Sequence, residues 1–206
     1  MLCYTIGHSN SSSEEFVSLL KRHGINRVID VRSAPYSRFA PQFNKEQVAV
    51  SLEGAGIAYE YRGDKLGGRH SNPAVLFPDG KVNFSLVRIQ QSFVRAAGEL
   101  MSACSGSQEK VCLMCAEKEP FDCHRFVLLG RHLAENGIRV EHIRSDGTTV
   151  EQRDLELKLL KQYEKRDYQL SLFEQPLDES QLLAQAYELR NKDIVPSNNP
   201  SAGGRI

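Results

Sequence analysis

The sequence is short of the features that mark several classes of protein. The 206 residues contain 26 Lys and Arg and 26 Asp and Glu, so the formal net charge is zero. That balance argues against a histone-like or tail-like nucleic-acid binder, which needs a large excess of positive charge. No apolar run approaches the ~20 residues of a membrane helix, and the start, MLCYTIGHSN, lacks the basic region and cleavage site of a secretory signal. We therefore expect a cytoplasmic protein with no membrane partner.

Two further absences concern disulfides and nucleotide motifs. Cysteine occurs five times, an odd number, so we do not expect a framework of structural disulfides. The sequence has no Walker phosphate loop and no G-x-G-x-x-G motif, which disfavours ATP hydrolysis and ordinary dinucleotide binding. The length fits one domain with an extension.

Apolar runs alternate with helical patterns over residues 1–147. Ser12 and Glu15 fit a capping box, and Gly24 and Gly137 sit where glycines end helices. This alternation predicts a three-layer α/β domain with a mostly parallel, five-stranded sheet and helices on both faces. The predicted strands are LCYTIGH, NRVIDVRS, GIAYEY, KVCLMC and IRVEHI, and the predicted helices cover residues 14–23, 45–55, 84–103 and 124–136.

The chain beyond Gly147 differs in composition and predicts a helical extension. We expect a charged helix over 148–167, a linker over 168–176, a short helix over 177–192 and a disordered tail over 193–206. Within the α/β domain, residues 62–83 form a long connection rich in glycine and proline, and such connections are usually functional or disordered. We interpret this segment as a lid over the site, with a surface insertion as the alternative.

The strongest motif for chemistry is CAEKEPFDCHR, residues 115–125. Cys115 should end a buried strand, and Cys123 should begin the next helix, where backbone N–H groups and the helix dipole lower the pKa of a thiol. Glu117 between them can act as a general acid or base. The predicted catalytic residues are Cys115, Glu117, Cys123 and His124.

Three interpretations of the two thiols in this motif stay open. In the first, one of them is a catalytic or redox cysteine. In the second, both thiols and His124 hold a metal, with or without His8; the C-x7-C-H spacing matches no common zinc pattern, so we rank this below the others and expect no metal. In the third, the thiols only fill the core, and Glu117, His124 and Arg125 function.

A second motif, DVRSAPYSRF, follows the second predicted strand. Arginine forks suit phosphate or carboxylate, and aromatic rings can stack on a base. The alternative is that Arg32 pairs with a buried acid such as Asp30. His8, after the first strand, either binds substrate or hydrogen-bonds a backbone carbonyl. The predicted anion- or substrate-binding residues are His8, Arg32, Tyr36, Ser37, Arg38 and Arg125.

Taken together, these segments resemble the domain-of-unknown-function 488 family. The matching stretches are TIGHSN, VIDVRSAPYSRFAPQFN, LGGR, LMCAEKEPFDCHR and HIRSDG, and they span about residues 1–147. The resemblance implies a small α/β domain and supplies no established reaction. It implies that the functional polar positions are Arg32, Ser37, Cys115, Glu117, Cys123, His124 and Arg125.

The extension carries a separate motif, QLSLF, residues 169–173. It closely resembles the short peptide by which bacterial replication and repair proteins dock on the β sliding clamp. Leu172 and Phe173 would fill a hydrophobic pocket, Leu170 would support them, and Gln169 would hydrogen-bond at the rim. The alternative is that the apolar residues pack back on the domain or form an edge strand.

These motifs lead to one expected function and two alternatives. We expect an enzyme that acts on a nucleotide or on DNA by hydrolytic or group-transfer chemistry. The clamp motif would recruit it to the sliding clamp and thus link it to DNA repair or replication. The alternatives are a non-catalytic adaptor that binds nucleic acid or protein, and a thiol-redox or metal protein. The sequence names no cofactor.

Overall fold

The computed structural model describes residues 1–106, 109–163 and 177–196. Its strands form one sheet in the order β3-β2-β4-β1-β5-β6. All neighbouring pairs are parallel except β5 with β6, which is antiparallel. The mostly parallel α/β sheet is therefore confirmed. The strands are β1 (Leu2–Gly7), β2 (Arg27–Asp30), β3 (Ala58–Tyr61), β4 (Val111–Cys115), β5 (Arg139–Ile143) and β6 (Thr149–Glu151).

The sixth strand corrects the prediction of five strands and of a helix from residue 148. Asp146 accepts hydrogen bonds from the backbone and hydroxyl of Thr148, and Gly147 has a φ of 83°, so the chain turns back tightly. β6 then pairs with β5 as a hairpin before α7 (Gln152–Tyr163) begins. The Asp-Gly pair is a strong hairpin signal, and it was the clue to this strand in the sequence.

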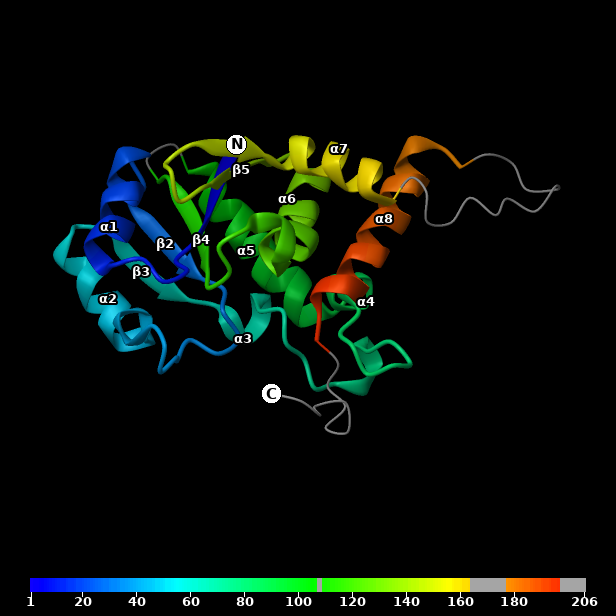
Figure 1. Cartoon of the computed structure of the whole chain (residues 1–206), viewed down its shortest axis with the longest axis horizontal. Coiled ribbons are helices and arrows are strands. Elements are labelled where there is room, and N and C mark those ends of the chain that lie inside the picture. The colour runs from blue at the N-terminus through cyan, green and yellow to red at the C-terminus, as the bar shows by residue number, and fades with distance from the viewer. Residues whose placement is uncertain (107–108, 164–176, 197–206) are drawn as a thin grey trace.

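Helices cover both faces of the sheet (Figure 1). Phe16 and Leu20 of α1, with Val48 and Leu52 of α2, form one apolar cluster against the sheet. The remaining long helices pack in a second cluster on the opposite face. The helices are α1 (Ser13–Arg22), α2 (Lys45–Gly54), α3 (Gly63–Leu66), α4 (Phe84–Arg88), α5 (Gln91–Ser105), α6 (Arg131–Glu135), α7 and α8 (Glu179–Ile194).

Local signals place the ends of several helices as the sequence predicts. Ser12 Oγ accepts from the Glu15 amide, and the Glu15 carboxylate accepts from the Ser12 amide, which completes the capping box of α1. Gly24 and Gly137 have φ angles of 67° and 78°, the left-handed conformation that glycine adopts without strain.

Two predicted helices are interrupted. The helix expected over 84–103 divides into α4 and α5, because Gln90 between them is extended. The helix expected over 124–136 begins as a π-helical segment, η4 (Arg125–Gly130), and continues as α6. π-Helical turns are rare and often occur at functional sites.

The sheet order creates one crevice at the carboxyl ends of its strands. After β2 the chain passes to the α2 face and on to β3, whereas after β4 it passes through η4 on the opposite face to β5. The two connections leave the neighbouring strands β2 and β4 in opposite directions, and ligands bind at such switch points in open α/β sheets.

The extension packs on the domain. Leu155 and Leu159 of α7, with Ala186 and Tyr187 of α8, belong to the second apolar cluster. α8 continues to Ile194, two residues beyond the predicted end, so residues 193–194 are not part of a tail. QLSLF and residues 197–206 lie outside the described residues. No helix in the described part of the chain has the length and hydropathy needed to cross a membrane.

The segment predicted to be a lid forms part of the pocket wall. It contains α3, a 3-10 turn η2 (Pro73–Val75), and a bridge between Leu76 and Val82. Leu66, Val75 and Val82 are each at most 2% exposed and belong to the core. Because these side chains are packed in the core, the segment is anchored to the domain at these three positions.

Candidate functional site

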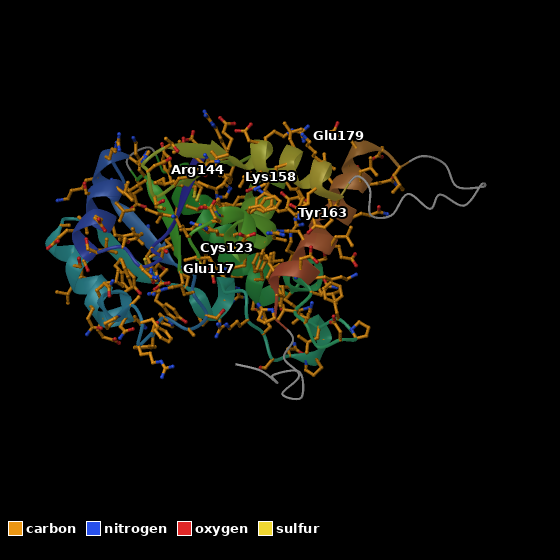
Figure 2. The ribbon with its side chains drawn as sticks, viewed as in Figure 1. Glu117, Cys123, Arg144, Lys158, Tyr163 and Glu179 are labelled. Atoms are coloured by element: carbon orange, nitrogen blue, oxygen red, sulfur yellow. The ribbon has the colours of Figure 1, made fainter. Side chains whose placement is uncertain are left out.

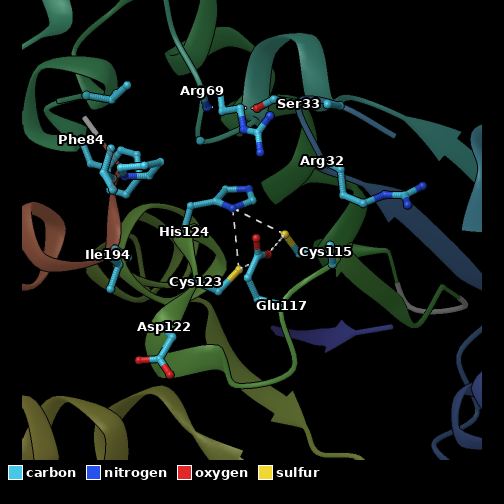
Figure 3. Close-up of a pocket in the computed structure, with 16 residues that line it drawn as sticks. Arg32, Ser33, Arg69, Phe84, Cys115, Glu117, Asp122, Cys123, His124 and Ile194 are labelled. Carbon is cyan, nitrogen blue, oxygen red and sulfur yellow. Dashed lines mark hydrogen bonds between the residues drawn. The ribbon is translucent and has the colours of Figure 1, made fainter. Parts of the chain in front are cut away.

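A pocket of about 460 Å³ opens at the crevice between β2 and β4 (Figure 3). Figure 2 shows two of its residues, Glu117 and Cys123, near the middle of the molecule. Its floor is formed by Cys115, Glu117, Cys123 and His124. One side carries Arg32, Ser33 and Arg69, and the other is apolar, with Val82, Phe84, Ile194 and Val195.

The floor brings four chemically active side chains into one cluster, and two segments supply them. Cys115 ends β4 and Glu117 follows two residues later, while Cys123 and His124 directly precede η4. His124 Nδ1 lies 3.6 Å from the sulfur of Cys115 and 3.7 Å from that of Cys123. Glu117 Oε2 lies 2.6 Å and 3.2 Å from the same two sulfurs. The structure thus assembles the four residues that the sequence predicts as catalytic.

The backbone of β2 fixes the orientation of His124. Its Nε2 lies 3.1 Å from the main-chain oxygen of Val31, so Nε2 carries a proton and donates it to that carbonyl. Nδ1 is therefore directed at the two sulfurs. A Cβ on Gly68 would lie 3.0 Å from Cβ and Cγ of His124, so a larger residue would require His124 to shift by a few tenths of an ångström.

The groups of the cluster shift one another's pKa values, and the two thiols shift in opposite directions. Burial raises the pKa of the Cys115 thiol, but a hydrogen bond from Cys123 and the charge of His124 lower it to about 6. Burial and the proximity of Cys115 raise the pKa of Cys123. Burial lowers the pKa of His124, but the charges of Cys115 and Glu117 outweigh it and raise that pKa. The pKa of Cys115 is thus lowered and that of Cys123 raised, whereas the position at a helix start predicts a lowered pKa for Cys123.

Arg32 lines the pocket but is already paired. Its Nε and Nη2 lie 2.9 Å and 2.6 Å from the two carboxylate oxygens of Asp30, and both residues are buried. Tyr59 donates a further hydrogen bond to Asp30. The alternative of a buried ion pair is confirmed, and Arg32 offers the pocket little net charge.

His8 supports Arg32 and does not line the pocket. Its Nδ1 donates to the main-chain oxygen of Ser9, and its Nε2 accepts from Arg32 Nη1 at 3.1 Å. Burial lowers the pKa of His8 to about 4, so the ring is neutral. The backbone-bonded alternative is the one observed.

Arg125 lies in the core, where no external anion can reach it. It is fully buried, and its Nη2 donates to the main-chain oxygens of Glu117 and Lys118 at 2.9 Å and 2.6 Å. Arg125, predicted to bind an anion, therefore does not line the pocket, because its side chain points back under the Glu117 loop. Its observed contacts position the backbone of that loop.

The other predicted anion-binding residues lie away from the pocket. The Tyr36 hydroxyl donates to Glu46, and Arg38 stacks on the exposed ring of Phe39. Ser37 bonds locally, its hydroxyl accepting from the Phe39 amide. Tyr36, Ser37 and Arg38 therefore do not join the cluster, because the turn after Pro35 carries them outward.

Ser33 and Arg69, which lie with Arg32 on one side of the pocket, were not predicted as site residues. The Arg69 amide donates to Ser33 Oγ at 3.0 Å, and Figure 3 shows the Arg69 side chain reaching over His124. Among the described residues, no acidic side chain pairs with Arg69. A side chain on Gly67 would collide with Ser33 Oγ at 2.2 Å. The Gly-Gly-Arg sequence was the signal, since paired glycines allow close backbone approach.

Comparison with known proteins gives a family and no function. No curated protein and no solved structure matches the chain. The sequence model of the family described as "Domain of unknown function DUF488" matches residues 12–132, more than half of the chain. The matched range runs from the cap of α1 into α6 and includes the four residues of the pocket floor. The chain therefore belongs to the DUF488 family.

Proposed function

We propose that this pocket is the active site of an enzyme that acts on a nucleotide or on DNA by hydrolytic or group-transfer chemistry. The observation that carries the proposal is the composition of the pocket. Arg69, which pairs with no acidic side chain in the described part of the chain, faces the same 460 Å³ as an apolar wall and a cluster of thiol, carboxylate and imidazole groups. That volume is within the ~300–1,000 Å³ of small-molecule sites.

Each side of the pocket suits one part of a nucleotide. Arg69 can pair with a phosphate, and the hydroxyl of Ser33 lies beside it. Phe84 and Ile194 offer the apolar surface that a base or sugar requires. The cluster on the floor lies between these two sides, so a bond near the phosphate would face the groups that can move protons.

Glu117 and His124 are the acid–base groups of this proposal. The Glu117 carboxylate reaches both sulfurs, and His124 Nδ1 lies 3.6 Å from the sulfur of Cys115. Because Glu117 is on the exposed side of the cluster, it can also reach a bound ligand.

The first experiment measures binding of AMP, ADP and a short single-stranded oligonucleotide to the full chain. We expect Arg69→Ala to weaken binding of at least one of these ligands by about 10-fold or more, since a hydrogen bond to a charged group is worth ~1.5–3 kcal/mol. Arg38→Ala is the matched control, because Arg38 lies outside the pocket, and it should bind normally. Equal affinity of the wild type and Arg69→Ala for all three ligands would contradict the assignment of Arg69 as the phosphate-binding residue.

The same ligands test catalysis. We expect Glu117→Gln to lower turnover of a bound ligand ~100-fold or more, the contribution of a positioned acid or base. Tight binding without turnover in the wild type would instead favour the adaptor alternative.

We further propose recruitment to the bacterial sliding clamp through QLSLF. The support is the sequence alone: the motif falls between α7 and α8, outside the described residues. Binding of the full chain to the clamp should be micromolar, ~8 kcal/mol, and should be lost when Leu172 and Phe173 are both changed to Ala. Leu157→Ala, an exposed leucine of α7, is the control. Absence of binding in the wild type would remove the link to replication or repair.

A further inference from the structure

We propose that the pocket floor is a zinc site. The four donor atoms are Cys115 Sγ, Glu117 Oε2, Cys123 Sγ and His124 Nδ1, which all lie within 4.8 Å of one another. The site deepens the proposed function, since it occupies the same pocket, but metal binding can be measured without any substrate.

The distances between the donors fit a tetrahedral ion. With Zn–S of ~2.3 Å and Zn–N of ~2.0–2.1 Å, a tetrahedron places sulfur and nitrogen ~3.6 Å apart. His124 Nδ1 lies 3.6 Å and 3.7 Å from the two sulfurs. Glu117 Oε2, at 2.6 Å and 3.2 Å from them, is closer than this geometry requires. Glu117 is exposed, so the outward shift that this geometry requires carries the carboxylate toward solvent.

The donor set selects the metal. Two thiolates and an imidazole favour zinc over magnesium or calcium, which take oxygen ligands. Two cysteines and a histidine are also a set used by catalytic zinc, where a fourth position stays exchangeable. Glu117 is the one donor on the exposed side, so it occupies that position. Water or a phosphoryl oxygen of the ligand can replace it, which joins the metal to the proposed reaction.

Contacts behind the donors hold them in place without a ligand. The Val31 carbonyl takes the Nε2 proton of His124, which is the usual outer contact of a metal-binding histidine and leaves the Nδ1 lone pair free. The backbone N–H of Arg125 lies 3.5 Å from the sulfur of Cys123 and stabilises a thiolate there. The donors are therefore preorganised by β2 and by the start of η4.

The charges and protons balance. Zn²⁺ binds two thiolates, one carboxylate and one neutral imidazole, so every proton that the free cluster holds on the two sulfurs and on Nδ1 of His124 is released to solvent, and no electron is transferred. The occupied site carries one net negative charge. The buried guanidinium of Arg125 offsets it, because its side chain runs beneath the Glu117 loop.

The ligands of this site differ in one position from those that the sequence suggests. The spacing of the two cysteines and His124 matches no common zinc pattern, and His8 was the suggested fourth ligand. In the structure His8 bonds to Arg32 and Ser9, while Glu117 completes the set. A ligand supplied from inside the seven-residue spacer explains why the pattern is unfamiliar.

The test is titration of the reduced, metal-depleted full chain with Co²⁺, followed by competition with Zn²⁺. We expect one equivalent to give thiolate-to-cobalt charge transfer and the visible bands of a tetrahedral ion, and one equivalent of Zn²⁺ to remove them. Cys115→Ala and Cys123→Ala should each lower the affinity at least 100-fold. Glu117→Ala should keep the charge-transfer band and change the visible bands, because water takes the vacated position.

The matched control is Cys104→Ala, a buried cysteine of α5 outside the cluster, which should bind cobalt as the wild type does. Far-ultraviolet circular dichroism checks that each variant folds. No charge-transfer band in folded, reduced wild type would overturn the zinc site, as would an unchanged band in Cys115→Ala. Zinc binding with no nucleotide binding would leave the site standing and reject the proposed substrate.

Discussion

Asp30 and Arg32 form a two-point ion pair beneath the pocket, with oxygen–nitrogen distances of 2.9 Å and 2.6 Å. Both side chains are buried, and the pair holds the end of β2 where His8 and Tyr59 also converge. A buried pair contributes little net stability, but breaking it leaves one charge uncompensated.

We expect Asp30→Asn to lower the free energy of unfolding by ~3–5 kcal/mol, because Arg32 keeps its buried charge without a counter-ion. Urea denaturation of the wild type and Asp30→Asn measures this loss of free energy of unfolding. The control is Lys192→Ala, which removes a more exposed pair with Glu188 and should cost less than ~1 kcal/mol. Similar losses in the two variants would mean that Arg32 reaches solvent when its partner is removed.

The buried imidazole of His142 makes stability depend on pH. Thr5 donates to its Nδ1, its Nε2 donates to Gln152, and burial together with the charge of Arg125 lowers the pKa of His142 to about 3. In the unfolded chain the His142 imidazole binds a proton near pH 6.5, whereas in the folded chain it stays neutral until the pH approaches 3. The contribution of His142 to the free energy of unfolding is therefore complete above about pH 6.5. It is lost as the pH falls toward 3, by up to ~1.4 kcal/mol per pH unit.

Urea denaturation from pH 7 to pH 5 measures this slope. His142→Asn removes the titrating ring and should flatten the dependence, although it lowers stability at neutral pH. His8 has the same direction of shift, so the variant keeps a smaller slope. An identical slope in wild type and His142→Asn would assign the pH dependence to other groups.

Gly7 allows the Glu117 loop to cross the end of β1. A Cβ there would lie 1.8 Å from the main-chain oxygen of Glu117, so Gly7→Ala must displace the loop or the strand. We expect a loss of more than ~4 kcal/mol or failure to fold. Gly98→Ala, in the middle of α5 with open space around it, should stabilise by ~0.5–1 kcal/mol. Thermal unfolding compares the two; equal effects would contradict the close approach at Gly7.

Asn191 of α8 is bonded to the pocket wall. Its Oδ1 accepts from the Phe84 amide at 2.7 Å, and its Nδ2 donates to the Val82 carbonyl at 2.9 Å. Asn191→Ala leaves both buried groups unpaired, at ~1–3 kcal/mol each. We expect faster hydrogen exchange at Phe84 than in the wild type. An unchanged exchange rate would show that the backbone at Phe84 stays protected without the Asn191 hydrogen bonds.

Five strands and the capped helix α1 were predictable because their signals are local. Val and Ile runs mark β2 and β4, and the Ser12–Glu15 box depends on residues three apart. β6 is not predictable from its own three residues, which are too few to show the alternating pattern of a strand, although Asp146-Gly147 marks the turn before it. The site motif is predictable because its signal is also local: residues 115–125 are continuous in sequence.

The sequence by itself determined which residues carry chemistry, because thiols, a carboxylate and an imidazole stand within eleven positions between a strand and a helix. Only the tertiary structure decided how they are used. Whether Arg125 faces the pocket or the core depends on the missing side chain of Gly7 and on the carbonyls of the Glu117 loop. Whether Arg32 meets an anion depends on Asp30, and whether His124 meets the sulfurs depends on Val31. These partners come from other strands, and no local pattern encodes a contact between distant segments.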